Sequence, residues 1–504
     1  MSPTTIGSVP DSSLDRLIAS IPDLLVRGPT GDVAVDALAY DSRKVGAGTL
    51  FFCVPGALTD GHRFAPEAVA AGAAALVVER DLDLDVVQVV VSDARRALAR
   101  MAAAFYGDPA GELTLIGITG TNGKTTTAYL VDAILRADDL STGLIGTIET
   151  RVGNRTRAGV RTTPESLDLQ ELFAEMRDEG VTAVAMEVTS HALALHRVEG
   201  LTFNVAGFTN LTQDHLDFHA DMEDYFEAKR SLFVPERAER GAVNVDDPYG
   251  RRLFASAAIP CVGFGTSDDA EIRAGDVSFE QNVTRFTIRT PKGDLRIETG
   301  LIGAFNVSNC LAAAALCLQA GVAPEVVERG IASLDAVPGR FESVNEGQPF
   351  SVVVDYAHTP DSLDNVLRSA RGVAERNGGR VLVVFGCGGD RDRGKRPLMG
   401  GIAARGADVV LVTSDNPRSE DPAAIVDEIL EGVVAQRRQG ADFVDVDRTT
   451  AIDEAIRRAR EGDVVVIAGK GHETYQEFAG QTIDYDDRAV AREALRRAGF
   501  GGVS

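Results

Sequence analysis

A short glycine- and threonine-rich turn, residues 117–127, constrains this chain more than any other stretch. It reads Gly117-Ile-Thr-Gly120-Thr-Asn-Gly123-Lys124-Thr125-Thr126-Thr127. The apolar residues 113–118 before it predict a short buried strand, and residues 126–135 after it have helical spacing with one apolar face. A strand, a glycine-bearing turn and a helix that starts with Lys-Thr form a site for nucleotide phosphates, because backbone amides and the lysine face the phosphate oxygens. The stretch therefore predicts a nucleotide-binding α/β domain.

This turn departs from the general phosphate-loop pattern at one position. The pattern G-x-x-x-x-G-K-[ST] requires glycine at position 118, where this chain has Ile118. The residues present form the tighter G-x-x-G-K-T, which keeps the lysine and the hydroxyl at the start of the helix. Lys124 would supply a positive charge to the phosphates, and Thr125 would offer its hydroxyl to Mg²⁺.

Length and composition narrow the class of protein. A chain of 504 residues exceeds one hydrophobic core, so two to four domains are expected. The net charge of −24 argues against non-specific nucleic-acid binding, which needs a basic face.

Residues 1–13 lack the basic and apolar regions of a signal peptide, and the apolar run 68–78 is too short to span a bilayer. Five scattered cysteines without metal-ligand spacing fit buried thiols in a reducing cytoplasm. We therefore expect a cytoplasmic protein without membrane insertion.

The chain divides into three expected units, residues 1–110, 111–337 and 338–504. The first is a mixed α/β unit with strands at 50–54 and 75–78 and a helix at 65–75. Its loops are rich in Ser, Arg, Asp and Gly, and either bind a ligand or are simply turns. In the other two units short apolar runs alternate with helical stretches, as in doubly wound, mostly parallel sheets. A hinge is expected at residues 337–340. These runs are residues 183–186, 205–208 and 242–245, then 352–354, 381–385, 409–413 and 464–468.

The histidines are concentrated near the predicted ends of strands. All seven occur in or beside polar, glycine-rich segments at predicted strand ends, and none is expected on a plain helix face. Ligands of open α/β sheets bind beyond the carboxyl ends of the strands, so the pattern favours chemistry for some of them. They are His62, His191, His196, His215, His219, His358 and His472.

Eight short segments follow one another in a fixed order between about residues 40 and 490. They are Gly120-Thr-Asn-Gly-Lys-Thr125, Met186-Glu-Val-Thr-Ser-His191, Asn210-Leu-Thr-Gln-Asp-His215, Glu227-Ala-Lys229, Gly303-Ala-Phe-Asn306, Asp355-Tyr-Ala-His-Thr-Pro360, Asp415-Asn-Pro-Arg418 and Gly469-Lys-Gly-His-Glu473. Together they resemble the ATP-dependent Mur amide ligases of peptidoglycan assembly, in which the shortened phosphate loop is normal. The resemblance implies a UDP-substrate domain, a central phosphate-loop ATPase domain and a Rossmann-like C-terminal domain that receives an amino acid.

The resemblance also implies a reaction. An ADP-forming ligase of this kind would join meso-diaminopimelate to the D-glutamyl γ-carboxylate of UDP-MurNAc-L-Ala-D-Glu through an acyl phosphate. Lysine or another diamino acid remains an open alternative. A folylpolyglutamate-type ligase is disfavoured by the segment Asp41-Ser42-Arg43, and a nucleotide-dependent switch is disfavoured because Glu187, His215 and Lys229 are all present. Small-molecule partners only and a monomer are expected.

Site residues follow from the resemblance, position by position. The expected ATP contacts are Gly120, Thr121, Asn122, Gly123, Lys124, Thr125, Thr126, Asn306, Arg340 and Asp355, with His358 nearby. The UDP-substrate contacts are Ser42, the loop 56–59, Thr162, Thr163, Thr189, Ser190 and Arg197. Leu195 stands where the family often has Gln and cannot make that hydrogen bond, and Thr189 replaces a common Ser but keeps the hydroxyl. Arg340, beside the hinge, would reach an ATP phosphate only when the domains close.

Five residues are expected to carry catalysis, to hold Mg²⁺, or to do both. Lys124 is the catalytic cation, Thr125 and Glu187 supply hard oxygen ligands, and His215 supplies nitrogen to a second ion. From its residues alone, Lys229 looks like a lysine on a helix surface. The resemblance implies instead that CO₂ carbamylates it, which would turn a cation into an anion with two oxygen ligands.

The amino-acid pocket is expected in the C-terminal unit. Its expected residues are Arg391, Asp415, Asn416, Pro417, Arg418, Gly469 and Glu473. Arg418 is either a solvated arginine in a turn or the group that grips the distal carboxylate of diaminopimelate with two parallel hydrogen bonds. The resemblance favours the second role, in which Arg418 binds the distal carboxylate of diaminopimelate.

Overall fold

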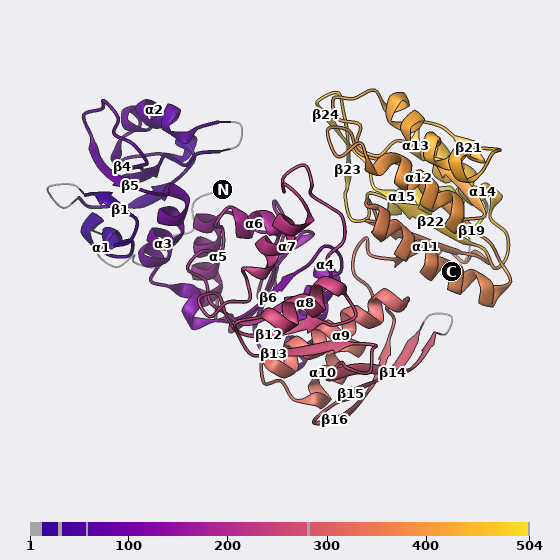
Figure 1. Ribbon diagram of the computed structural model, residues 1–504. Helices are drawn as coiled ribbons and strands as arrows, with labels where there is room; N and C mark the ends of the chain where they lie inside the picture. Colours follow the sequence, from indigo (N-terminus) through magenta and orange to yellow (C-terminus); the bar gives the residue numbers. More distant parts are fainter. Residues whose placement is uncertain (1–12, 29–32, 57–58, 280–282, 502–504) are drawn as a thin grey trace.

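The computed structural model describes residues 13–28, 33–56, 59–279 and 283–501, and these residues form three large sheets and one two-stranded sheet. Each sheet falls within one of the three expected units. The N-terminal and C-terminal parts lie on either side of the central part (Figure 1). Across the described ranges, no helix is both long and apolar enough to cross a membrane.

The N-terminal sheet has five strands in the order β1-β5-β4-β3-β2, and all neighbours are parallel except β1 and β5. The expected helix 65–75 is too long, because α2 ends at Ala70 and the positive φ of Gly72 (102°) turns the chain into β4. The elements are α1 (Leu14–Ile18), β1 (Leu25–Arg27), β2 (Ala37–Ala39), β3 (Thr49–Phe52), α2 (Ala65–Ala70), β4 (Ala73–Val78), β5 (Val87–Val91) and α3 (Ala94–Tyr106).

The central sheet has eleven strands, and its middle is parallel in the order β13-β12-β11-β6-β10-β7. The hairpin β8–β9 extends one edge, and β14, β15 and β16 extend the other. The strands are β6 (Thr114–Thr119), β7 (Thr142–Ile145), β8 (Glu149–Val152), β9 (Arg155–Ala158), β10 (Ala183–Glu187), β11 (Phe203–Phe208), β12 (Ala238–Asn244), β13 (Cys261–Gly265), β14 (Ile272–Phe279), β15 (Thr284–Thr290) and β16 (Gly293–Thr299).

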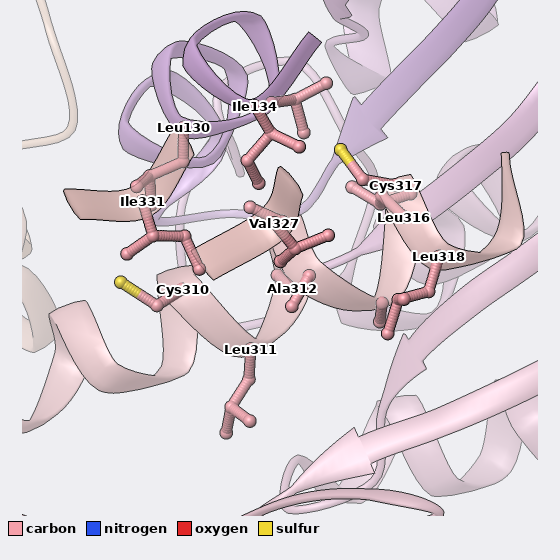
Figure 2. Close-up of a cluster of buried hydrophobic side chains, with 14 of the residues drawn as sticks. Leu130, Ile134, Cys310, Leu311, Ala312, Leu316, Cys317, Leu318, Val327 and Ile331 are labelled. Carbon is pink, nitrogen blue, oxygen red and sulfur yellow. The ribbon is translucent and has the colours of Figure 1, made fainter. Parts of the chain in front are cut away.

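Helices cover both faces of this sheet. On one face α4, α9 and α10 bury a shared apolar cluster that includes Ile134, Leu316 and Val327 (Figure 2). The glycine at 330 allows α10 to approach α4 closely, since a Cβ built there would lie 2.3 Å from the Cα of Ile134. This packing holds α4 against the sheet. The helices are α4 (Lys124–Ala137), α5 (Ser166–Asp178), α6 (Ser190–Ala194), α7 (Met222–Arg230), α8 (Pro248–Ser256), α9 (Ala304–Gln319) and α10 (Pro324–Ala332).

The C-terminal sheet has six strands in the order β17-β18-β22-β19-β20-β21, and only the β17–β18 pair is antiparallel. A separate hairpin, β23–β24, lies beside it. The elements are β17 (Glu342–Ser343), β18 (Ser351–Asp355), α11 (Pro360–Asn377), β19 (Val381–Phe385), α12 (Lys395–Gly406), β20 (Val409–Val412), α13 (Pro422–Gln436), β21 (Phe443–Val444), α14 (Arg448–Arg458), β22 (Val464–Ala468), β23 (Tyr475–Phe478), β24 (Gln481–Asp484) and α15 (Asp487–Arg497).

Candidate active site

The phosphate loop joins β6 to α4 at the carboxyl edge of the central sheet. Gly120 and Gly123 have φ of 146° and 87°, a region that favours glycine, so the loop can turn tightly into the helix. Lys124 begins α4, and its Nζ donates to the carbonyl oxygens of Gly120 (2.9 Å) and Thr121 (2.8 Å). Burial lowers the pKa of this lysine. The loop therefore has the backbone and the cation that a phosphate group needs.

Glu187, at the end of β10, lies directly beside the loop and is only 1% exposed. Its Oε2 accepts hydrogen bonds from the hydroxyls of Thr125 (3.0 Å) and Thr147 (3.1 Å). Its Oε1 accepts from the backbone N–H of Thr147 at 2.8 Å. Thr147 was not predicted, because nothing in its local sequence marks it.

This hydroxyl–carboxylate pair fits Mg²⁺. The part of the chain that the structure describes contains no group of three His, Cys, Asp or Glu residues that could hold a metal ion. Mg²⁺ is usually held by one or two carboxylates together with water and substrate phosphates, and Thr125 with Glu187 offers that donor set.

The segment after β11 places His215 beside His191, which follows β10. His215 has a positive φ of 56°, and its Nε2 lies 3.5 Å from Oδ2 of Asp214. The ring of His191 stands edge-on to that of His215, with 4.8 Å between centroids. Burial lowers the pKa of His215 to about 4, which leaves its imidazole neutral. His191 lies in the first turn of α6, four residues after the end of β10, and so beside a strand end as expected.

Lys229 is not a helix-surface lysine. It lies near the end of α7, is 1% exposed, and its Nζ donates to the carbonyl oxygen of Gly120 at 2.9 Å. The same nitrogen lies 4.6 Å from the ring centroid of Tyr225, whose hydroxyl is 3.1 Å from that of Thr121. Burial, and next the charge of Lys124, place the pKa of Lys229 well below its ordinary value. α7 therefore delivers a buried amine to the phosphate loop.

The domain boundary also reaches the phosphate loop. Arg340 donates from Nη2 to the hydroxyl of Thr125 at 3.1 Å, and its guanidinium lies 4.5 Å from the ring centroid of Tyr356. Asp355 accepts the backbone N–H groups of residues 341 and 357 at 2.6 and 2.8 Å. Burial raises the pKa of Asp355 to about 6. Arg340 thus contacts the residue that follows Lys124 at the start of α4.

The structure gives Asn306 an internal role. Its amide donates to the carbonyl oxygen of Ile302 at 2.9 Å and accepts from Asn309 Nδ2 at 3.0 Å. Asn309, one helical turn further along α9, lines the cavity that contains the phosphate loop. It also crowds Gly123, because a Cβ built on that glycine would lie 2.4 Å from Oδ1 of Asn309. The i, i+3 spacing of two asparagines on one helix was the available signal for this residue.

Polar residues of the central unit form the other wall of the cavity. Thr162, Thr163, Thr189 and Arg197 line it, while Ser190 is 1% exposed and its hydroxyl has no partner among the described residues. Ser42 lies in a short 3-10 turn of the N-terminal unit, away from this cavity. In the loop 56–59, residues 57 and 58 lie outside the described residues.

Most of the expected amino-acid residues line a second cavity, of about 410 Å³, which is bounded by the C-terminal unit and by residues of the central unit such as Asp214 and His215. Arg418 lines it, donates from Nη1 to the carbonyl oxygen of Gly389 (2.8 Å), and has its Nε 3.3 Å from Oε2 of Glu477. Pro417 is not among the lining residues. Burial, and next the charge of Asp415, raise the pKa of Glu473. The expected residues that line this cavity are Arg391, Asp415, Asn416, Arg418, Gly469 and Glu473.

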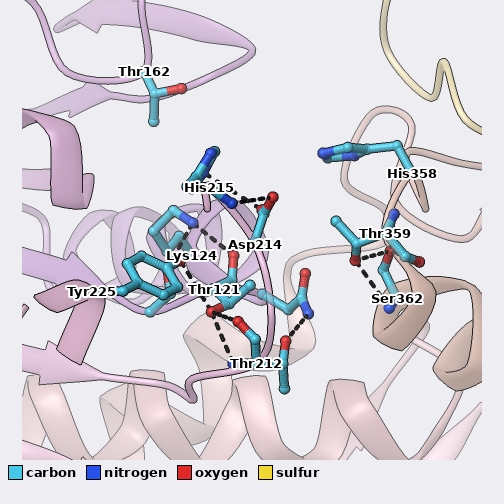
Figure 3. Close-up of polar contacts among 12 residues, drawn as sticks. Thr121, Lys124, Thr162, Thr212, Asp214, His215, Tyr225, His358, Thr359 and Ser362 are labelled. Carbon is cyan, nitrogen blue, oxygen red and sulfur yellow. Dashed lines mark hydrogen bonds and ion pairs between the residues drawn. The ribbon is translucent and has the colours of Figure 1, made fainter. Parts of the chain in front are cut away.

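The two cavities meet. The first, of about 780 Å³, contains the phosphate loop, and it shares part of its wall with the amino-acid cavity. His358 faces the Asp214–His215 segment across this junction (Figure 3). The shared residues are His191, Asp214, His215, Tyr356, His358 and Arg391. A phosphate bound at the loop and an amine bound in the C-terminal pocket would therefore approach each other here.

Family comparisons cover most of the chain. Residues 34–106 match a domain described as Mur ligase family, catalytic domain. Residues 118–317 match the Mur ligase middle domain, and residues 339–471 match the Mur ligase, glutamate ligase domain.

Individual relatives are similar over nearly their whole length. A protein of Geobacillus kaustophilus is 52% identical over 476 residues, covering 93% of this chain and 96% of its own. One of Solibacter usitatus is 53% identical over 471 residues, covering 92% and 94%. Both are named UDP-N-acetylmuramoyl-L-alanyl-D-glutamate–2,6-diaminopimelate ligase. A solved structure of a ligase with that name is 32% identical, with a TM-score of 0.67, and covers 92% of this chain and 96% of its own.

Proposed function

Since the chain belongs to the Mur ligase family, we propose that it is the ATP-dependent ligase that adds meso-diaminopimelate to UDP-MurNAc-L-Ala-D-Glu. The observation that carries this proposal is the wall shared by the phosphate-loop cavity and the amino-acid cavity. A ligase must bring an activated carboxyl group and an amine together, whereas a simple ATPase needs no second cavity.

The reaction needs ATP because a carboxylate is a poor acyl donor. The D-glutamyl γ-carboxylate takes the γ-phosphoryl group of ATP, which releases ADP and forms an acyl phosphate. The amine of diaminopimelate then attacks the acyl carbon, and the tetrahedral intermediate expels inorganic phosphate and leaves the amide. The amine must lose a proton for this step.

Phosphoryl transfer depends mainly on positioning and on neutralising charge. Lys124 and Arg340 approach the phosphate loop from the two sides of the domain boundary, and both would face the phosphate oxygens. Mg²⁺, held by Thr125 and Glu187, would neutralise further charge when bound. Thr162, Thr163, Thr189, Ser190 and Arg197 would hold the muramoyl-dipeptide, and Ser42 the UDP end.

A second metal position would be built from His215 and a carbamylated Lys229. The neutral imidazole of His215 suits a metal ligand. An amine reacts with CO₂ in its neutral form, and the buried environment of Lys229 favours that form. A carbamate would carry two anionic oxygens, which a lysine ammonium cannot offer.

In the C-terminal pocket, Arg391 and Arg418 would receive carboxylates, and Asp415 and Glu473 an ammonium group. Lysine lacks the distal carboxylate, so this charge pattern favours diaminopimelate over lysine. Ligation of lysine or another diamino acid is the alternative.

We also propose the three-domain division 1–110, 111–337 and 338–504, because each sheet ends within one unit. A monomer that acts in the cytoplasm on small molecules is part of the same proposal. The five free cysteines are compatible with a reducing compartment.

The test is product formation from UDP-MurNAc-L-Ala-D-Glu, screened over diaminopimelate, lysine and ornithine. Phosphate release should require ATP, the UDP-dipeptide and the amino acid together. Rapid phosphate release from ATP alone would favour a nucleotide switch, and equal use of lysine would favour the alternative substrate.

A further inference from the structure

Lys470 is a fully buried cation that no expected role uses. It follows β22 in the loop before Glu473, and its side chain is 0% exposed. Its Nζ donates to Oδ1 of Asn416 at 3.0 Å and to Oε2 of Glu473 at 3.1 Å, and it lies 5.4 Å from the ring centroid of Tyr475. It is not among the residues that line the amino-acid cavity, whereas Asn416 and Glu473 are.

We propose that Lys470 is a positioning residue for amino-acid recognition: together with Asn416, it holds Glu473 in the orientation that receives the ammonium group of the incoming amino acid. This inference rests on the proposed ligase function. Burying an ammonium group is costly unless it is paired and hydrogen-bonded, and here both hydrogen-bonding partners belong to the pocket.

The hydrogen bonds of Asn416 show how the orientation is set. Its Oδ1 accepts from Lys470 and from the backbone N–H of Glu477 at 3.1 Å, while its Nδ2 donates to Oε2 of Glu473 at 2.9 Å. Reversing the amide would point its NH₂ group at the lysine ammonium, so the cation selects one orientation. Asn416 is therefore bound mainly to its neighbours rather than free for a ligand.

Glu473 is held by only one of its two oxygens. The bonds from Lys470 and Asn416 both end on Oε2, and within the described ranges Oε1 has no hydrogen bond. Because Glu473 lines the cavity, Oε1 is available to a ligand there. The arrangement anchors one oxygen and presents the other.

Charge gives Lys470 a second effect on the same carboxylate. The groups facing Glu473 are Asp415 after β20, Tyr356 after β18, Tyr475 on β23 and Lys470 itself. Burial and Asp415 raise the pKa of Glu473, while Lys470 and Asn416 act in the opposite direction. Removing the cation would make protonation of Glu473 easier, and a protonated Glu473 binds an ammonium group poorly.

The test compares Lys470→Met with Lys292→Met, a control at an exposed lysine in the β15–β16 turn. For the amino acid that the wild-type enzyme ligates, we expect Lys470→Met to raise KM on the order of 10–100-fold, as for loss of hydrogen bonds to charged groups. KM for ATP should not change. The acidic limb of kcat/KM for the amino acid should move to higher pH, which a merely structural defect would not produce.

Further variants separate this role from misfolding. Lys470→Gln keeps a donor without the charge and should lie between wild type and Lys470→Met. In a Glu473→Gln background, adding Lys470→Met should cost much less than it does in wild type, because the two residues act together. The role of Lys470 would be overturned if a folded Lys470→Met or Lys470→Gln enzyme kept its KM and pH profile. It would also be overturned if the effects of Lys470→Met and Glu473→Gln were fully additive. Either result would leave the proposed ligase function standing. A wild-type protein that ligates no amino acid would overturn the proposed function and the inference together.

Discussion

The guanidinium of Arg340 donates a 3.1 Å hydrogen bond to the hydroxyl of Thr125, which joins the start of the C-terminal unit to the phosphate loop of the central unit. The two residues are 215 positions apart in the chain. The same hydroxyl donates to Glu187, so one threonine connects the proposed metal carboxylate, the phosphate loop and the domain boundary.

Arg340→Ala should therefore reduce kcat more than it changes KM for the amino acid. The arginine would stabilise phosphate charge during transfer, and loss of one such donor costs on the order of 10²–10³-fold in rate. Steady-state kinetics with each substrate varied in turn would measure this. An arginine away from the site, Arg285→Ala on β15, is the control. Near-wild-type kcat in Arg340→Ala would contradict the role.

Lys124→Ala should abolish ligation, with a loss at least on the order of 10³-fold. The fold should persist, because only two carbonyl contacts of a half-buried side chain are lost. Product formation, with circular dichroism as the check on folding, would measure this. Wild-type turnover in a folded variant would show that the loop does not bind the reacting phosphates.

Lys229 should carry the mass of one added CO₂ in the active enzyme, measured by mass spectrometry under conditions that preserve carbamates. Lys229→Ala should lose activity on the order of 10²-fold or more, because the second metal position loses its oxygen ligands. A small carboxylate such as formate should restore part of the activity. An unmodified Lys229 in a fully active enzyme would refute the carbamate.

Arg418 should decide between diaminopimelate and lysine. Its guanidinium already contacts Gly389 and Glu477, and a partly buried arginine left without a substrate carboxylate should disfavour lysine on the order of 10³-fold. Arg418→Ala should raise KM for diaminopimelate and narrow that preference. Arg393→Ala is the matched control, because Arg393 is exposed and pairs with Glu428 outside the cavity. An unchanged preference in Arg418→Ala would contradict the assignment.

The buried pair Arg448–Asp487 should matter for stability. Both side chains are 0% exposed and are joined by two hydrogen bonds of 2.7 Å, and Arg448 also donates to the carbonyl oxygens of Ser414 and Ala468. Asp487→Asn leaves a buried charge without its partner, which should cost about 3–5 kcal/mol of unfolding free energy. Denaturant unfolding would measure this, and the paired Arg448→Met/Asp487→Leu variant should lose less. Equal losses would contradict the pairing argument.

Much of the fold could be predicted because its signals are local. The strands at residues 381–385 and 464–468 have the predicted bounds, since β-branched runs buried on both faces are continuous in the sequence. The helix 65–75 was overextended, because alanines that suit a helix also suit the buried strand β4. The positive φ of Gly72 ends the helix, and the alanine-rich sequence after it did not indicate where β4 begins.

The candidate site was predictable only where residues form contiguous motifs. The phosphate loop, the carboxylate at the end of β10 and the Asp415–Arg418 segment could each be located in the chain. The roles of Thr147 and Lys470 could not be predicted, because they come from Glu187 and Asn416, which are distant in the sequence. The spacing of residues along the chain does not predict which side chains of two different units come into contact.

By itself the sequence determined a phosphate-binding turn between a strand and a helix, three α/β units and the Mur ligase resemblance. Only the tertiary structure decided that Lys229 is buried against the carbonyl oxygen of Gly120, and that Arg340 reaches Thr125. It also decided that the two cavities share one wall. The physical reason is that local patterns fix backbone conformation and which face is apolar, whereas burial and hydrogen bonding of a given lysine depend on which elements pack over it.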